Sequence, residues 1–154
     1  MNTTEKLAAA LWEAERHMET LKEALAEWNR SPAATWEALE ADRAKVRVVD
    51  QLLFRFTKLQ DAVGERLVPA TLAVLREPFE EWPMRDRLNR LDKLGYLNVA
   101  DWLAWREIRN RLAHEYPDLP EVRFAALTAA IDAAWSLAAL CQDWRNRLKS
   151  AELI

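Results

Sequence analysis

Apolar side chains recur at alternating steps of four and three residues along much of the chain, the spacing that places them on one face of an α-helix. In the first segment these positions are Leu7, Leu11, Ala14, Met18, Leu21, Leu25 and Trp28. Composition agrees with the spacing, because 26 alanines and 23 leucines make up nearly a third of the 154 residues, whereas valine, isoleucine and threonine together number 18. The sequence therefore predicts an all-α protein.

Prolines, capping residues and one glycine divide this pattern into helices. We expect Thr3 or Thr4 to cap the first helix and Pro69 to break or kink the second. The expected segments are a first helix ending at 29–32, a second over 35–67, a short helix over 84–94 closed by Gly95, a helix from Asn98 or Asp101 to Tyr116 or just before it, and a last helix from about Pro120. The first stripe also suits a coiled-coil seam, although it lasts barely three heptads. We expect one domain over residues 1–154, an up-and-down four-helix bundle with one additional short helix.

Several classes of site are disfavoured by what the chain lacks. Its single cysteine, Cys141, cannot form an intrachain disulfide or a CxxC metal site, which suits a reducing cytoplasm. Its two glycines, Gly64 and Gly95, cannot make a phosphate-cradling loop. Charged residues interrupt every apolar run before it reaches the length of a membrane span, about 18 residues, so we expect no membrane helix. In the first 22 residues the charges are interleaved with the apolar residues, so we expect no signal peptide. We also expect no metal and no cofactor.

The formal net charge of -3 argues against a protein that coats nucleic acid, yet one segment is basic. Three arginines, an asparagine, a histidine and a tyrosine fall within eleven residues there: Arg106, Arg109, Asn110, Arg111, His114 and Tyr116. On a helix Asn110 and His114 are neighbours, whereas Arg109 needs its long side chain to converge with His114. The other histidine, His17, lies among charged residues of the first helix, where we expect a solvated surface side chain.

This combination can support cleavage of RNA without a metal ion. A histidine that titrates near neutral pH can move a proton, and an arginine can bind a phosphate and spread its charge. The ribose 2′-OH would attack the adjacent phosphorus, so DNA would be spared. A twofold dimer would supply both a base and an acid. The structural alternative is a basic helix end that complements the helix dipole.

The string Arg109-Asn110-Arg111-Leu112-Ala113-His114-Glu115-Tyr116 fits R-N-x-x-x-H-x-Y. It resembles the signature of the HEPN superfamily and, because a tyrosine follows the histidine by two residues, that of its HepT-like toxins. The stretch 54–64, FRFTKLQDAVG, also resembles the second helix of HepT-like proteins. The order of elements agrees over most of the chain.

The resemblance implies a homodimeric four-helix bundle that acts as a metal-independent RNase in a type VII toxin–antitoxin pair. Arg109 and His114 would be catalytic, with Asn110 supporting them. From the charge of the basic cluster we also expect Arg106 and Arg111 to bind RNA. Tyr116 would accept AMP from a minimal nucleotidyltransferase (MNT) antitoxin, which would add bulk and negative charge beside the site. Two alternatives remain open: a catalytically silent nucleotide- or substrate-binding partner of a nucleotidyltransferase, and a plain dimeric adaptor.

The eight tryptophans suit core and interface packing better than base stacking. We expect Trp82, in the proline-rich loop, to be the most exposed of them. A second basic run, Arg85, Arg87, Arg90 and Lys93, is diluted by Asp86 and Asp92 and is expected to be a solvated face.

Overall fold

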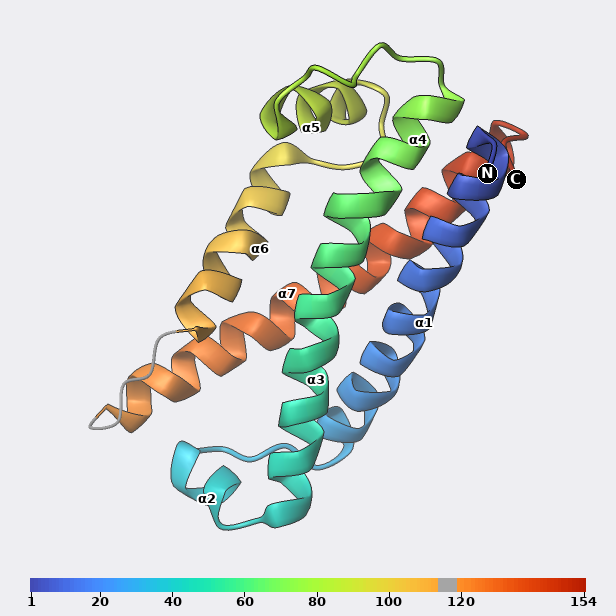
Figure 1. Cartoon of the computed structure of the whole chain (residues 1–154). Coiled ribbons are helices and arrows are strands. Elements are labelled where there is room, and N and C mark those ends of the chain that lie inside the picture. The colour runs from blue at the N-terminus through green and yellow to red at the C-terminus, as the bar shows by residue number, and fades with distance from the viewer. Residues whose placement is uncertain (114–118) are drawn as a thin grey trace.

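The protein is all-helical in a computed structural model that describes residues 1–113 and 119–154 (Figure 1). Its elements are α1 (Thr3–Arg30), α2 (Trp36–Glu40), α3 (Arg43–Ala62), the π-helical turn η1 (Val63–Leu67), α4 (Val68–Val74), α5 (Met84–Lys93), α6 (Val99–Leu112) and α7 (Pro120–Ser150). No strand occurs within these two ranges. The expected all-α class is thereby confirmed.

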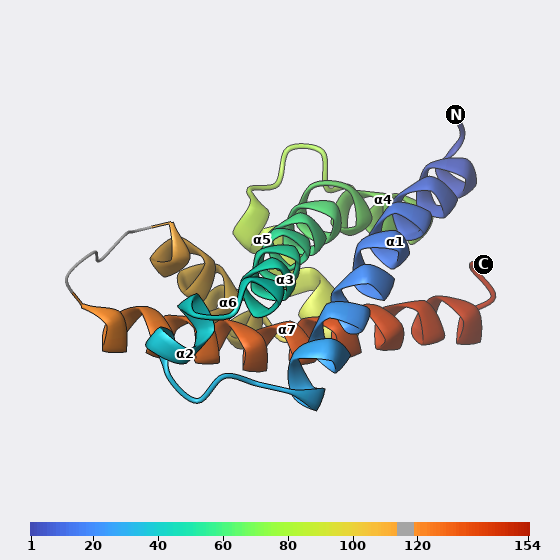
Figure 2. The same ribbon diagram turned by 90° about the horizontal axis from the view of Figure 1, so that it is seen from below.

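The core lies where α1, α3, α4 and α7 meet. Helix α1 packs along α3 and also against α4 and α7, and α6 packs mainly on α7 (Figures 1 and 2). The expected apolar stripe of α1 is buried throughout, from Leu7 to Trp28. Trp144 of α7 is fully buried and donates its indole N–H to the hydroxyl of Thr71 at 3.0 Å. One hydrophobic core therefore joins segments from both ends of the chain.

Side-chain caps mark the starts of α1, α2, α3 and α6. Asn2, rather than Thr3 or Thr4, caps α1, because its side-chain oxygen accepts the N–H of Glu5 at 2.8 Å. Asn98 caps α6 as expected, accepting the N–H of Asp101 at 3.0 Å. Helix α7 begins at Pro120, also as expected.

The prediction of one continuous helix over 35–67 is wrong at Asp42. Its carboxylate accepts the backbone N–H groups of Ala44 and Lys45 and so begins α3 anew after the short α2. A side chain that satisfies the free donors of a first turn stabilises such a restart. Over Val63–Leu67 the helix widens into η1 without being interrupted.

The predicted break at Pro69 does not occur, because the π-turn accommodates the proline. Val68 donates its N–H to the carbonyl of Val63, five residues earlier, and α4 continues from there with Pro69 in its first turn. A proline lacks an N–H, so it is tolerated where the regular i−4 pairing has already changed. Helices α3, η1 and α4 therefore form one long rod (Figure 1).

Gly95 closes α5 as expected, with a left-handed φ of 85°. A Cβ at this position would also lie 2.8 Å from Cζ of Arg147, a side chain that can move. We expect Gly95→Ala to lower the free energy of unfolding by about 1–2 kcal/mol, mainly because an L side chain disfavours this backbone conformation. Urea unfolding would measure it. Gly95→Asn should lose less, since asparagine tolerates positive φ, and equal losses for the two variants would contradict this explanation.

Three of the eight tryptophans are buried in the core, as expected for most of them. Trp28, Trp102 and Trp144 are buried. The expected exposure of Trp82 is wrong, because its side chain is half-buried, whereas Trp12 is 60% exposed and Trp135 42%. Trp12 and Trp135 therefore lie on the outer faces of their helices, a position that the spacing of apolar residues did not predict.

Among the helices of the described ranges, only α7 has the length and the apolar composition that a membrane-spanning helix needs. The core helix of a folded domain meets the same criterion. Leu137 and Trp144 of α7 are fully buried inside the protein. A membrane span is therefore only weakly supported.

Candidate functional site

The basic cluster lies on α6, and a close helix contact fixes where α6 sits. Trp102 of α6 is 1% exposed, and its indole packs beside Gly64 in η1. A Cβ on Gly64 would lie 3.2 Å from Cζ2 of Trp102, closer than ordinary packing allows. Glycine at this position thus lets α6 approach the α3–α4 rod, and Trp102 anchors α6 in the core.

Two side chains from the end of α3 then hold α6 by polar contacts. Gln60 is fully buried and donates its amide N–H to the backbone carbonyl of Trp105 at 3.2 Å. Asp61 accepts from Nη1 of Arg109 at 2.5 Å in an ion pair whose side chains are about one third exposed or less. Arg109 therefore lies against α3 and does not extend freely into solvent.

The remaining predicted residues of α6 face away from this contact. Arg106, Asn110 and Arg111 are exposed, and Arg111 pairs at 3.6 Å with Glu107, one turn earlier. Arg106 and Asn110 are four residues apart and so share a face, whereas Arg109 is offset from Asn110 by about 100° around the helix. Within the described part of α6, Arg109 therefore packs on α3, whereas Asn110 lies on the exposed side of the helix.

His114 and Tyr116 lie outside the described residues. Helix α6 is described to Leu112, with Ala113 as its C-cap. The predicted convergence of Arg109 with His114, and the position of Tyr116, thus remain predictions from spacing.

The pairing with Asp61 leaves Arg109 able to bind a second anion. The carboxylate contacts Nη1, and the other guanidinium N–H groups have no partner within residues 1–113 and 119–154. Because the guanidinium presents five donors in a rigid fork, one edge can pair with a carboxylate while another faces a phosphate. The ion pair also limits the rotamers that Arg109 can adopt.

Asp61 and Gln60 were not assigned roles from the sequence. Asp61 is the only carboxylate between Asp50 and Glu65, in a helix that is apolar over a wide arc. A lone acid in such a setting signals a specific partner, since charged groups in partly buried positions are usually paired. This pattern predicts that Asp61 has a partner, but it does not indicate that the partner is Arg109, 48 residues away.

The expectation that His17 is a solvated surface histidine is wrong. Its side chain is 17% exposed, and Nδ1 lies 2.8 Å from Nη1 of Arg55 on α3. As Arg55 can only donate, Nδ1 must be the acceptor, which requires a neutral imidazole. Burial, followed by the charge of Arg55, lowers the pKa of His17 below its ordinary value of 6.5, although Glu13 acts in the opposite direction.

This lowered pKa gives a sign to the pH dependence of stability. Below about pH 6.5 the unfolded chain takes up a proton at His17 that the folded chain resists, so the free energy of unfolding falls as pH falls through that range. We expect His17→Gln, whose amide oxygen can still accept from Arg55, to lose less stability than the wild type between neutral pH and about pH 5. Urea unfolding of both proteins measures the difference. An identical pH dependence would contradict the assignment.

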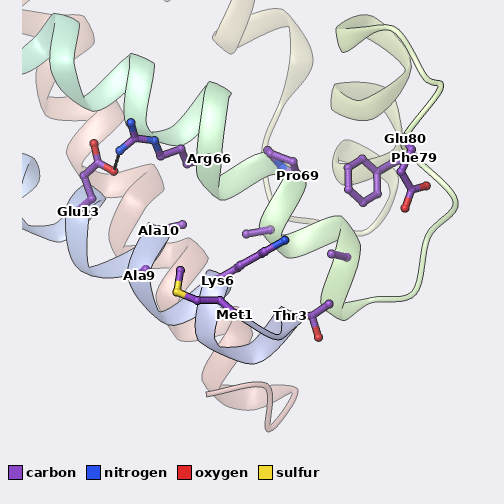
Figure 3. Close-up of a pocket in the computed structure, with 12 residues that line it drawn as sticks. Met1, Thr3, Lys6, Ala9, Ala10, Glu13, Arg66, Pro69, Phe79 and Glu80 are labelled. Atoms are coloured by element: carbon purple, nitrogen blue, oxygen red, sulfur yellow. Dashed lines mark hydrogen bonds and ion pairs between the residues drawn. The ribbon is translucent and has the colours of Figure 1, made fainter.

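A groove of about 650 Å³ lies between α1 and α4 and is separate from this cluster (Figure 3). Alanines line much of it, with Phe79 at one end and the Glu13–Arg66 ion pair at the other. None of its lining residues belongs to α6. Among the described residues, no group of three or more His, Cys, Asp or Glu side chains could hold a metal ion.

Comparisons with known proteins add no relative: no family model matches the chain, nor does any curated protein or solved structure.

Proposed function

We propose that the chain is a metal-independent endoribonuclease toxin of the HEPN type, the toxin of a HEPN/MNT toxin–antitoxin pair. In this proposal it is an up-and-down four-helix bundle with one additional short helix, works as a homodimer in the cytoplasm and needs no cofactor. The observation that carries the proposal is the position of Arg109, which lies in the last turn of α6 and is held there by Asp61 of α3. Arg109 is also the first residue of the string R-N-x-x-x-H-x-Y.

The reaction follows from the chemistry of these side chains. The ribose 2′-oxygen forms a bond to the adjacent phosphorus while the bond from phosphorus to the 5′-oxygen breaks, leaving a 2′,3′-cyclic phosphate and a free 5′-hydroxyl. His114 of one protomer takes the 2′ proton, and His114 of the other protomer gives a proton to the leaving oxygen. Arg109 stabilises the charge that develops on the phosphoryl oxygens.

The other residues of the cluster would bind and orient the strand. Arg106 and Arg111 are exposed and can contact flanking phosphates, and Asn110 supports the site from the same helix. Two copies of the cluster across a twofold axis would form a short basic cleft in a chain with a net charge of -3.

Tyr116 is the proposed control point. Transfer of AMP from ATP onto its phenol oxygen by an MNT-type nucleotidyltransferase antitoxin, with loss of the phenol proton and release of pyrophosphate, would place a phosphate beside Arg109 and His114. That charge would compete with the RNA phosphate for Arg109 and block the cleft.

The ion pair of Arg109 with Asp61 favours one second candidate, a catalytically silent nucleotide- or substrate-binding partner of a nucleotidyltransferase, because the carboxylate offsets part of the arginine's charge. Expression without the antitoxin separates the two candidates. We expect the wild type to arrest growth and the Arg109→Ala and His114→Ala variants, at equal protein levels, not to do so. Equal harmlessness of all three would contradict the toxin assignment and favour the silent partner.

A further inference from the structure

Phe54 is an exposed aromatic ring on a helix whose other large apolar side chains are buried or half-buried. Its side chain is 51% exposed, whereas Leu52 and Phe56, two residues away on either side, are fully buried. Single exposed apolar side chains are common on protein surfaces, so the evidence for a ligand comes from the groups that surround this ring.

Two cations flank this ring. Cζ of Arg55 and Nζ of Lys58 each lie 5.6 Å from the ring centroid. The guanidinium of Arg55 is held in place by His17 of α1, and Lys58 is exposed. Two cations therefore lie against the ring, and one of them is fixed by a neighbouring helix; the carboxylate of Asp50 is one turn away on α3.

The helical register connects this ring to the candidate site. Phe54, Lys58 and Asp61 are separated by steps of four and three residues, so they share one face of α3. Phe54 is seven residues, or about 10 Å along the axis, from Asp61. Because Asp61 contacts Arg109, a strand that lies along this face reaches the proposed catalytic arginine.

The surroundings of Phe54 favour nucleic acid over a protein partner. The residues one turn away on α3 are Asp50, Gln51, Thr57 and Lys58. Protein interface cores are depleted of lysine and aspartate, and their aromatic residues are usually set among other apolar side chains. A single ring flanked by cations is typical of surfaces that stack bases and contact phosphates.

We propose that Phe54, with Arg55 and Lys58, forms a subsite that binds single-stranded RNA beside the cleavage site. The ring stacks on one base, while the two cations contact the adjacent phosphates. Its distance from Asp61 corresponds to about three nucleotides of a stacked strand at 3.4 Å each. This subsite rests on the proposed endoribonuclease function and gives it a substrate class, an unpaired strand that extends several nucleotides from the scissile phosphate.

The test measures binding of a 5′-fluorescein-labelled 12-nucleotide oligouridylate by fluorescence anisotropy, with His114→Ala in every protein to prevent cleavage. We expect Phe54→Ala to weaken binding by about 5- to 150-fold, the range for loss of one stacked base. Phe54→Tyr should bind within about twofold of the parent, because its ring also stacks. Thermal unfolding checks that each variant is folded.

Trp12 provides a matched control. It is also exposed and has a cation, Arg16, 4.8 Å from its ring, but it lies on α1. We expect Trp12→Ala to leave the affinity for RNA unchanged. Equal affinities of Phe54→Ala and the parent, equal losses for the Phe54 and Trp12 variants, or no RNA binding by the parent would each overturn the subsite.

Failure of the Phe54 subsite and failure of the proposed nuclease activity give different results. If the protein with His114 restored cleaves RNA but Phe54→Ala binds normally, the subsite is wrong and the nuclease stands. If binding depends on Phe54 but the protein with His114 restored cleaves nothing, the subsite stands and the nuclease is wrong. If Phe54→Ala instead disrupts only the dimer or binding of a nucleotidyltransferase, the ring is a protein contact and the subsite is overturned.

Discussion

Purified Arg109→Ala protein is expected to cleave a labelled single-stranded RNA at least about 100-fold more slowly than the wild type. The estimate follows from the loss of one preorganised donor to the transition-state oxyanion, which typically costs 10²- to 10³-fold. Stability should change little in comparison, because the ion pair that Arg109 makes with Asp61 is partly exposed. Initial rates with saturating RNA, measured beside thermal unfolding curves, test both parts.

Three further variants show whether the effect belongs to the guanidinium fork. Arg109→Lys keeps the charge but not the fork, so it should recover only a small part of the activity. Arg111→Ala removes an exposed arginine of the same helix and should cost less than tenfold. Asp61→Asn should lower the turnover rate more than the affinity, since Asp61 positions Arg109. Equal losses for Arg109→Ala and Arg111→Ala would indicate general charge and contradict a specific role for Arg109.

Transfer of AMP to the chain is expected to depend entirely on Tyr116. After incubation with an MNT-type nucleotidyltransferase partner and ATP, the intact mass of the wild type should rise by one or more AMP units and its RNA cleavage should cease. Tyr116→Phe, which lacks the acceptor oxygen, should show neither change. The physical reason for inhibition is the added negative charge beside Arg109 and His114, which repels the RNA backbone.

The only other tyrosine, Tyr96, provides the control. It is buried and packs against Trp144, and burial raises the pKa of its phenol, so its oxygen is a poor acceptor. Tyr96→Phe should therefore be modified like the wild type. Modification of Tyr116→Phe, or a modified wild type that still cleaves RNA, would contradict the switch.

Local signals in the sequence predicted much of the fold. The stripe of α1, the cap at Asn98, the glycine after α5 and the proline that begins α7 act within a turn or two of their own positions. The restart at Asp42 and the uninterrupted passage through Pro69 were missed. The same capping side chain can bond to the backbone N–H groups of a first turn or stay solvated. A π-turn has less favourable hydrogen bonds than an α-helix and forms only where packing offsets that cost. Both outcomes therefore depend on tertiary contacts.

The candidate site was predictable only along one helix. Spacing placed Arg106, Asn110 and Arg111 on α6, but the partner of Arg109 is Asp61, on a helix 48 residues earlier. Likewise the neutral state of His17 depends on Arg55, 38 residues away. Contacts between helices require the register of both helices, which a one-dimensional periodicity does not supply.

The most direct test of the central claim is cleavage of one defined RNA by the purified chain in the presence of EDTA. The substrate is compared with the same strand carrying a single 2′-deoxyribose at the cleaved position, and the wild type with His114→Ala. We expect the wild type to cleave only the all-ribose strand and to leave a 2′,3′-cyclic phosphate, and the variant to cleave neither. Cleavage of the deoxy-substituted strand, undiminished cleavage by His114→Ala, or no cleavage by the wild type would contradict the account.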